Sequence, residues 1–462
     1  MTQVLPRRAF WWIEPLFALA ILAGGIRTIL FIKNYGYFPQ PFFYDSSDTW
    51  MDWFNTAFWA HDPGAYDSWG TVYPPISFVF LKYTTLSYCY NGSGTILGQQ
   101  ARSCDWLGLF MLNAWLVLNA VLIALTFRKS DKSTALYRWY ALAFGFPMIN
   151  GWERGNLILV CFTAFMLAHG PLLKSARLRW LFAAISFNFK VYLISSISAY
   201  LLRRRWRYFE GAMILSVVVY VVTWAIYGHG SPLEVYNNLR DVAEGGQANQ
   251  LLDVWSATTY QSVYSLLTGP GWPMIAIIGS QKVELATTFI TVSTRATQIA
   301  ILFAALATWL RPEVISNYRI VNLITCLALV TAETGAYSQT MLIFMTFFER
   351  WEGIGRRWAL VGCYVLCIPY DIYIDPLATA LRPGLLNGPP VLYEFWITAG
   401  PFIRPGIILS IAFALSCVTI RTVWLDIRLQ GWKDRKRARF DLPIMLGGGR
   451  APKAAEIETM AQ

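Results

Sequence analysis

Five aspartates and no lysine, arginine or glutamate lie in a loop of about forty residues that follows the first apolar segment and ends at Tyr73-Pro74-Pro75. Asp45, Asp48 and Asp52 stand at positions i, i+3 and i+7, so a helix would place their carboxylates on one stripe. The opposite stripe would be apolar, and its members are Trp50, Trp53, Phe54, Ala57 and Phe58. We expect this amphipathic helix to lie flat on the bilayer surface, with the acids at the water boundary. Carboxylates held there are candidates for acid–base catalysis.

A lysine stands in the middle of an apolar segment that is basic at both ends, Arg179 and Arg207. Only about 23 apolar-rich residues lie between the basic ends, too few for two crossings of roughly 20 residues each. We therefore expect two half-length helices that meet at Lys190. A buried ammonium is costly and needs a partner or a wet cavity, and an anionic phosphate is the natural partner. The alternative is that Lys190 pairs with a structural acid or reaches the interface.

The turn from Trp152 to Asn156 separates two apolar runs and ends where the second run starts. Gly155 permits close backbone approach, and the free N–H groups at the start of a helix favour an anion. Arg154 could therefore bind a phosphate or a sugar. Alternatively, Glu153 and Arg154 are an ordinary solvated pair in a hairpin.

Two further polar stretches could contact a substrate. The run from Ser256 to Tyr264 is rich in hydroxyl, amide and aromatic groups, which suit a carbohydrate, although polar loops of this kind are often only solvated. Glu333, just before the run Thr334 to Gln339, could line a cavity or be a simple loop acid. The histidines show no metal-ligand spacing, so we expect neither a metal nor a cofactor. The candidate sugar contacts in the first stretch are Tyr260, Gln261 and Ser262.

The elements that position these residues are membrane helices. With 56% hydrophobic and 14% charged residues, a chain of 462 residues is too apolar for a soluble protein. We expect an all-α polytopic membrane protein with about 10–12 membrane helices, in one domain over residues 1–430, followed by a basic cytoplasmic tail over residues 431–462. The apolar runs of spanning or near-spanning length are 10–33, 105–127, 135–149, 156–173, 207–227, 284–309, 320–334, 358–374 and 401–427.

The basic residues cluster at one set of helix ends, which we expect to be cytoplasmic. The loops 34–104, 228–283 and 375–400 then face outward, and the run 74–88 must be interfacial or re-entrant. We expect a multi-pass plasma (inner) membrane protein with its site on the extracytoplasmic side. The net charge of +11 is explained by this topology and by contact with anionic lipid, so nucleic-acid binding is not supported.

Two of the seven cysteines differ from the others in their surroundings. Cys89 and Cys104 bracket a polar outward insert, and in an oxidising compartment a disulfide between them would close that loop. The other cysteines lie in apolar segments, where they are expected to act as small hydrophobic residues.

The order of these features resembles that of the GT-C glycosyltransferases, and most closely glycosyltransferase family 87, which includes mannosyltransferases that use polyprenol-phosphate-mannose. The likeness covers most of residues 10–350. It implies a GT-C helical bundle in which Asp48 matches the general base of the family and Asp52 is its neighbour. The family's Asn-Gln-Ser element is kept only in part, and Tyr337-Ser338-Gln339 stands where members often have a histidine. The other matching positions are Tyr73-Pro74-Pro75, Gly155-Asn156 and Lys190.

The resemblance implies an inverting transfer of a sugar from a polyprenyl-phosphate carrier to a hydroxyl of a lipid-linked or cell-envelope glycan. The donor phosphate would be bound by Lys190, Arg154 and Asn156. A transporter or flippase of lipid-linked glycan is an alternative, because it also needs intramembrane charge and a broken helix. A polysaccharide polymerase or ligase is a further alternative. The expected substrate contacts are Asp45, Tyr73, Tyr260, Gln261, Ser262, Glu333 and Gln339.

Overall fold

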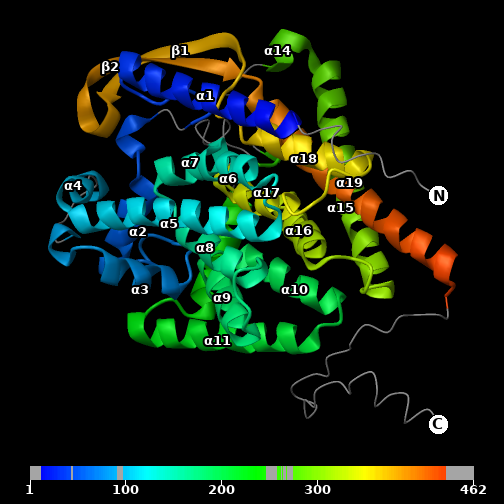
Figure 1. Ribbon diagram of the computed structural model, residues 1–462. Coiled ribbons are helices and arrows are strands. Elements are labelled where there is room, and N and C mark those ends of the chain that lie inside the picture. Colours follow the sequence, from blue (N-terminus) through cyan, green and yellow to red (C-terminus); the bar gives the residue numbers. More distant parts are fainter. Residues whose placement is uncertain are drawn as a thin grey trace.

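The structure is a computed structural model, and it describes residues 12–42, 45–90, 97–245, 258–261, 263, 267 and 274–432. This part of the chain is mostly helical (Figure 1). Five of its helices are long and apolar enough to cross a membrane, which confirms the prediction of a helical membrane protein. They are α1 (Ile13–Tyr35), α5 (Trp106–Ser130), α11 (Trp206–Tyr227), α15 (Ser280–Leu310) and α19 (Gly400–Gln430).

The remaining helices are shorter. The α-helices among them are α2 (Met51–His61), α3 (Pro75–Thr84), α4 (Leu97–Cys104), α6 (Ala135–Phe144), α7 (Phe146–Arg154), α8 (Ile158–His169), α9 (Ala176–Phe189), α10 (Ile194–Leu202), α12 (Pro232–Gly245), α14 (Met274–Ile278), α16 (Asn317–Leu329), α17 (Gln339–Thr346) and α18 (Ile354–Leu366). Short 3-10 helices are η2 (Ser46–Asp48), η3 (Ser87–Tyr90), η4 (Val191–Leu193), η7 (Ala336–Ser338) and η8 (Leu385–Asn387).

One apolar run that we expected to be a single helix is broken. The run 135–149 is divided between α6 and α7 because Gly145 has an extended backbone and Pro147 lies in the first turn of α7. A proline at that position starts a helix readily but cannot continue one.

Helix α3 has 10 residues, fewer than the roughly 20 that a full crossing needs, in agreement with the prediction for the run 74–88.

Two short helices form the centre of the molecule. Nearly every residue of α8 is buried, and so is every residue of α17. The long helices are different: the spanning window of α1 is 17% buried and that of α5 is 22% buried. One polar link between the two kinds of helix is Asn119 of α5, which donates to the Leu159 carbonyl at 2.8 Å and accepts from Thr163 at 2.8 Å. The long apolar helices therefore surround a core of short ones.

The prediction that the apolar stripe of the first loop lies on the bilayer surface is wrong, because the stripe is buried inside the protein. The helical part of this loop, α2, buries Trp53, Phe54 and Ala57 completely inside the protein. The Trp53 ring meets the edge of Phe80 of α3 at 5.8 Å between centroids. An apolar stripe is satisfied equally well by lipid or by neighbouring helices, and here α3, α4 and α5 cover it. The sequence pattern alone did not distinguish the two environments.

The stretch that we expected to be an outward loop, 375–400, contains a β-hairpin. Strand β1 (Tyr373–Gly384) pairs antiparallel with β2 (Gly388–Thr398), and the hairpin lies beside α1 (Figure 1). The second strand is rich in aromatic and β-branched residues, which favour strands. Its Tyr393 stacks on Tyr37 with ring centroids 4.0 Å apart. The all-α prediction is therefore correct for most of the described chain and misses this hairpin.

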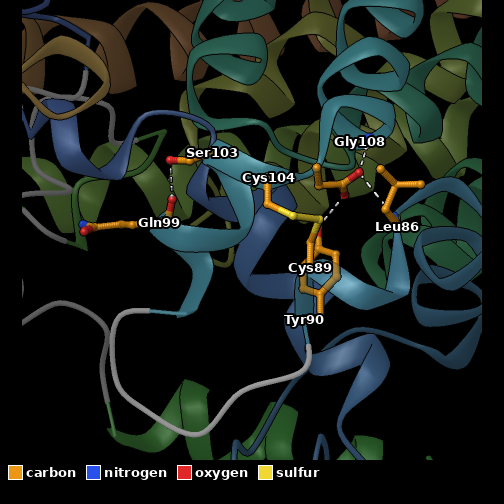
Figure 2. The surroundings of a disulfide bond; sticks show 8 residues. Leu86, Cys89, Tyr90, Gln99, Ser103, Cys104 and Gly108 are labelled. Atoms are coloured by element: carbon orange, nitrogen blue, oxygen red, sulfur yellow. Dashed lines mark hydrogen bonds between the residues drawn. A yellow bond between two sulfur atoms is a disulfide. The ribbon is translucent and has the colours of Figure 1, made fainter.

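The predicted disulfide is present (Figure 2). Cys89 lies in η3 and Cys104 is the last residue of α4, so the bond ties α4 to the segment that follows α3. Asp105 strengthens the same junction, because it accepts from the backbone N–H groups of Leu86 and Gly108 and from the Tyr90 hydroxyl.

Candidate active site

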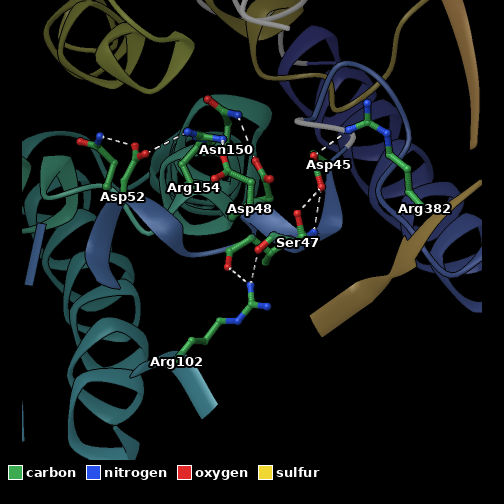
Figure 3. A network of polar contacts seen from close by, with 11 residues as sticks. Asp45, Ser47, Asp48, Asp52, Arg102, Asn150, Arg154 and Arg382 are labelled. Atoms are coloured by element: carbon green, nitrogen blue, oxygen red, sulfur yellow. Dashed lines mark hydrogen bonds and ion pairs between the residues drawn. The ribbon is translucent and has the colours of Figure 1, made fainter. Parts of the chain in front are cut away.

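The acidic segment is a turn followed by a helix, and not the single helix that the spacing predicts. Asp45 caps η2 by accepting from the Ser47 N–H at 3.0 Å and from its hydroxyl at 2.6 Å. Trp50 then adopts a left-handed conformation with φ of 65°, and α2 begins after it. A bulky side chain rarely adopts a positive φ, and such a residue persists only where its surroundings hold it. The break turns Asp45 toward Arg382 and leaves Asp48 and Asp52 facing Arg154 (Figure 3).

The turn between α7 and α8 supplies the partner of these acids. Gly155 has φ of +69°, and a Cβ atom there would lie 2.7–2.9 Å from the backbone of Trp50. Only glycine permits so close an approach in that conformation. The contact is fixed by the Trp50 N–H, which donates to the Glu153 carbonyl at 2.8 Å. The close backbone approach that we predicted at Gly155 is made by the turn of residues 45–50, the acid turn, and an anion at this helix start stays a prediction.

Arg154 lies between two carboxylates. Its guanidinium donates one hydrogen bond to Asp48 and another to Asp52, the latter at 2.9 Å. The side chains of Arg154, Asp48 and Asp52 are 19%, 31% and 21% exposed, so the group is sheltered but reachable from solvent. The alternative of an ordinary solvated pair between Arg154 and its neighbour in sequence therefore does not describe this guanidinium.

The electrostatics of the group set the protonation of Asp48. Burial raises the pKa of Asp48 to about 6, the Arg154 charge opposes that rise, and Asp52 adds to it. A carboxyl with a pKa of this size is ionised at neutral pH and retains appreciable affinity for a proton. That combination is what general-base catalysis near neutral pH requires.

A chain of contacts leads from these acids to Lys190. Asn156 donates to Asp52 at 2.7 Å and to the Tyr73 hydroxyl at 3.5 Å. The Lys190 ammonium lies over the Tyr73 ring, 4.8 Å from its centroid, and 5.5 Å from the centroid of Tyr337. Cation–π contacts of this kind stabilise a cation without neutralising it. The acids and the lysine therefore belong to one connected site.

Lys190 occupies the break that the sequence predicts. Helix α9 ends at Phe189, and η4 and α10 continue the segment after Lys190, so two half-length helices meet there. The side chain is half-buried. Within the described ranges no carboxylate forms an ion pair with its ammonium, and the structural acid considered as an alternative is not found there.

The predicted sugar contacts gather at a different place. Glu333 accepts from Thr258 and Thr259, including both backbone N–H groups at 2.8 and 3.3 Å, so it anchors that loop. Burial raises the pKa of Glu333, and the hydrogen bonds from Thr259 and Thr258 oppose that rise. The Tyr260 hydroxyl donates to the Phe402 carbonyl of α19 at 2.8 Å. These hydrogen bonds tie the loop to Glu333 and to α19, and none of them involves Asp48 or Asp52.

Three other predicted residues have distinct positions. Gln261 is exposed, and Ser262 lies outside the described residues. Gln339 is 1% exposed, and both polar atoms of its amide are buried and have no hydrogen-bond partner among the residues that the structure describes. It follows η7, which contains Tyr337 and packs on α7.

Two arginines that the sequence did not indicate hold the acid turn. Arg102 of α4 donates to the carbonyls of Ser47, at 3.0 Å, and Thr49. Arg382 of β1 pairs with Asp45 at 2.8 Å (Figure 3). The Asp45 carboxylate is thus already paired with Arg382, and a substrate that contacts Asp45 as predicted would bind beside this ion pair. The only signal for Arg102 was its place two residues before a predicted disulfide cysteine.

Metal binding has no candidate among the described residues, where no group of three or more His, Cys, Asp or Glu side chains could hold an ion.

No protein-family model matches the chain, and no curated protein and no solved structure matches it either. What the fold and the site define is a mostly helical membrane protein with a half-buried arginine between two aspartates, connected to a half-buried lysine.

Proposed function

We propose that this chain is a membrane glycosyltransferase that moves a sugar from a polyprenyl-phosphate carrier to a hydroxyl of a lipid-linked or cell-envelope glycan. The single observation that supports it best is the contact chain from Asp48 through Arg154, Asp52, Asn156 and Tyr73 to Lys190. A base at one end and an unneutralised cation at the other suit a displacement with an anionic leaving group.

The GT-C likeness of the sequence supports the same proposal. It adds a GT-C bundle with about 10–12 membrane helices, in which some of the shorter helices cross the membrane together with the five long ones. It also adds a plasma-membrane location with the site on the extracytoplasmic face. Both are part of the proposal.

In the proposed reaction Asp48 accepts the proton of the acceptor hydroxyl while its oxygen attacks the anomeric carbon. The bond from that carbon to the phosphate oxygen breaks on the opposite side, so the configuration inverts in one step. The carrier leaves as polyprenyl phosphate with the bonding electron pair. General-base assistance of this kind contributes roughly 10²–10⁴-fold to the rate.

Lys190 is the residue that we assign to the departing phosphate. Its ammonium faces the rings of Tyr73 and Tyr337 and has no carboxylate partner among the described residues. A phosphate that gains charge as the bond breaks would be stabilised there, and more strongly if water is excluded. A prenyl tail would reach this point from lipid beside the break between α9 and α10.

Arg154 and Asn156 were predicted to bind the phosphate as well. Their hydrogen bonds to Asp48 and Asp52 make orientation of the two acids the role that we propose for both. Asp52 then serves as the fixed partner that keeps Arg154 and Asn156 in place beside the base.

The test is incubation of the purified protein with a panel of prenyl-phosphate monosaccharides and glycan acceptors, with release of the carrier as the readout. We expect turnover with at least one donor, and a loss of roughly 10²-fold or more in Asp48→Asn. Asp67→Asn is the matched control, because Asp67 is an exposed acid of the same loop. Turnover in Asp48→Asn equal to that of the control would refute the assignment of the base.

A further inference from the structure

The β-hairpin is seated where a candidate membrane span ends. The Leu385 N–H at its tip donates to the Gly36 carbonyl at 2.7 Å, and Gly36 is the residue directly after α1. The Tyr37 ring stacks on Tyr393 of β2, and the Tyr37 hydroxyl accepts from the Glu394 N–H at 3.1 Å. Figure 1 shows the hairpin lying beside α1. The tip is therefore fixed at the end of α1.

The two faces of the hairpin differ in composition. On the inner face Tyr393 is fully buried and Phe395 is 8% exposed. On the outer face Leu381 and Leu392 lie directly opposite each other in the register, yet they are 71% and 56% exposed. Leu386 at the tip is 46% exposed. Large apolar side chains exposed together on one face mark a surface that meets another apolar phase.

The chemistry of the strands fits a lipid boundary. The next pair on the same face toward the tip is Pro383 and Pro390, both exposed. Proline has no N–H group, so prolines in an outer strand reduce the number of unpaired donors that a lipid environment would leave unsatisfied. Helix α1, beside which the hairpin lies, also exposes apolar side chains, and among them Ile29 and Leu30 are 68% and 52% exposed.

We propose that the outer face of the hairpin, formed by Leu381, Leu386 and Leu392, is a lipid-contacting surface inserted into the bilayer at the boundary where α1 ends. The occupant is the acyl region of the membrane, because the tip of the hairpin is bonded to the end of α1, a helix whose spanning window is 17% buried and must itself face lipid. This inference does not depend on the proposed reaction.

The acid turn is bound to the opposite, inner face of the hairpin. Arg382 of β1 pairs with Asp45 at 2.8 Å, and the Tyr393 hydroxyl accepts from the Ser46 N–H at 3.2 Å. Insertion of the outer face into the membrane would thus fix the position of the hairpin, and Arg382 and Tyr393 of the hairpin in turn bind the acid turn.

The test uses the full chain in lipid nanodiscs that contain a phosphatidylcholine with a diazirine in its acyl chain. After irradiation, peptide mass spectrometry is expected to find lipid adducts on Leu381, Leu386 or Leu392 and none on Tyr393. The double variant Leu381→Asp, Leu392→Asp should lose these adducts several-fold, whereas Thr379→Asp, an exposed change on the same face, should retain them. If the double variant does not fold, the labelling of the wild type decides the question.

Two results would overturn the proposal. One is labelling of these leucines by a water-soluble carbene reagent in place of the lipid probe, which would make the face solvent-exposed. The other is their protection from both reagents together with crosslinks between two copies of the chain, which would make the face a protein interface.

Discussion

Removal of the Arg154 charge is the most direct test of the electrostatics at this site. Arg154 opposes the rise in the pKa of Asp48 that burial and Asp52 cause. Without that charge the carboxyl must hold its proton to higher pH. In the proposed reaction Asp48 acts as a base and must be ionised, so activity should rise with pH through its pKa. The Arg154→Gln variant should therefore need a higher pH to reach full activity.

The size of the shift follows from the separation of the charges. Two unit charges about 4 Å apart interact by about 4 kcal/mol at an effective dielectric constant of about 20, equivalent to about three pKa units. The Asp48 and Arg154 side chains are 31% and 19% exposed, so solvent screening reduces this value, and we take about half of it. The pKa of Asp48 should then move from about 6 to about 7.5 in the variant.

The assay measures the initial rate of carrier release from about pH 5 to about pH 9, a range that includes both expected midpoints. The matched control is Arg154→Lys, which keeps the positive charge and should leave the midpoint near that of the wild type. A second measurement follows carbodiimide labelling of Asp48 against pH by mass spectrometry, and this requires no enzymatic turnover. An unchanged or lower midpoint in Arg154→Gln by both measurements would refute the argument.

Four further outcomes are expected. Lys190→Met should raise the KM for a prenyl-phosphate donor about tenfold or more with folding preserved, measured by steady-state kinetics, and unchanged donor kinetics would contradict its role. The folded-state pKa of Asp48, about 6, lies above its ordinary value of 3.8, so the stability that this carboxyl contributes is present at low pH and lost as the pH rises through 6. The free energy of unfolding of the wild type should therefore fall by roughly 2 kcal/mol between about pH 4 and about pH 6. Melting curves of Asp48→Asn should lack this decline. Replacement of Cys89 by Ser removes a bond that closes a separation of 15 residues, and denaturant titration should show a loss of about 3 kcal/mol that reduction reproduces in the wild type. Gly155→Ala should lower the melting temperature and weaken carrier release together, because a Cβ there meets the Trp50 backbone at 2.7–2.9 Å; a variant with normal stability would contradict that contact.

Local chemistry in the sequence was enough to predict some features of the site. The lysine between two basic ends predicted a break at Lys190, because the segment was too short to cross twice. Gly155 indicated a close approach to the backbone, although the expected neighbour was an anion and the observed one is the backbone of Trp50. Cys89 and Cys104 predicted a disulfide from their polar surroundings. Each of these conclusions rests on residues that are near one another in the chain.

Long-range partners were not predictable in the same way. The i, i+3, i+7 spacing of the aspartates favours one helix, but the conformation of Trp50 is set by a carbonyl more than one hundred residues away, that of Glu153. Arg382 lies 337 positions from Asp45 in sequence, and no local pattern links them. The β-hairpin likewise depends on Tyr37, a partner contributed by the start of the chain.

The geometry gives the acid turn an unusual degree of support for a loop. A turn with a bulky residue at positive φ is unfavourable in isolation by roughly 1–3 kcal/mol, so it persists only where other groups hold it. Here Arg102 binds two of its carbonyls, Arg382 binds its capping acid, and Glu153 accepts from Trp50. These three contacts come from α4, β1 and α7, which are far apart in sequence. Because all of them fix the backbone on either side of Asp48 and leave its carboxylate to Arg154, the turn is organised to hold one charged group in a defined position, as a catalytic base requires.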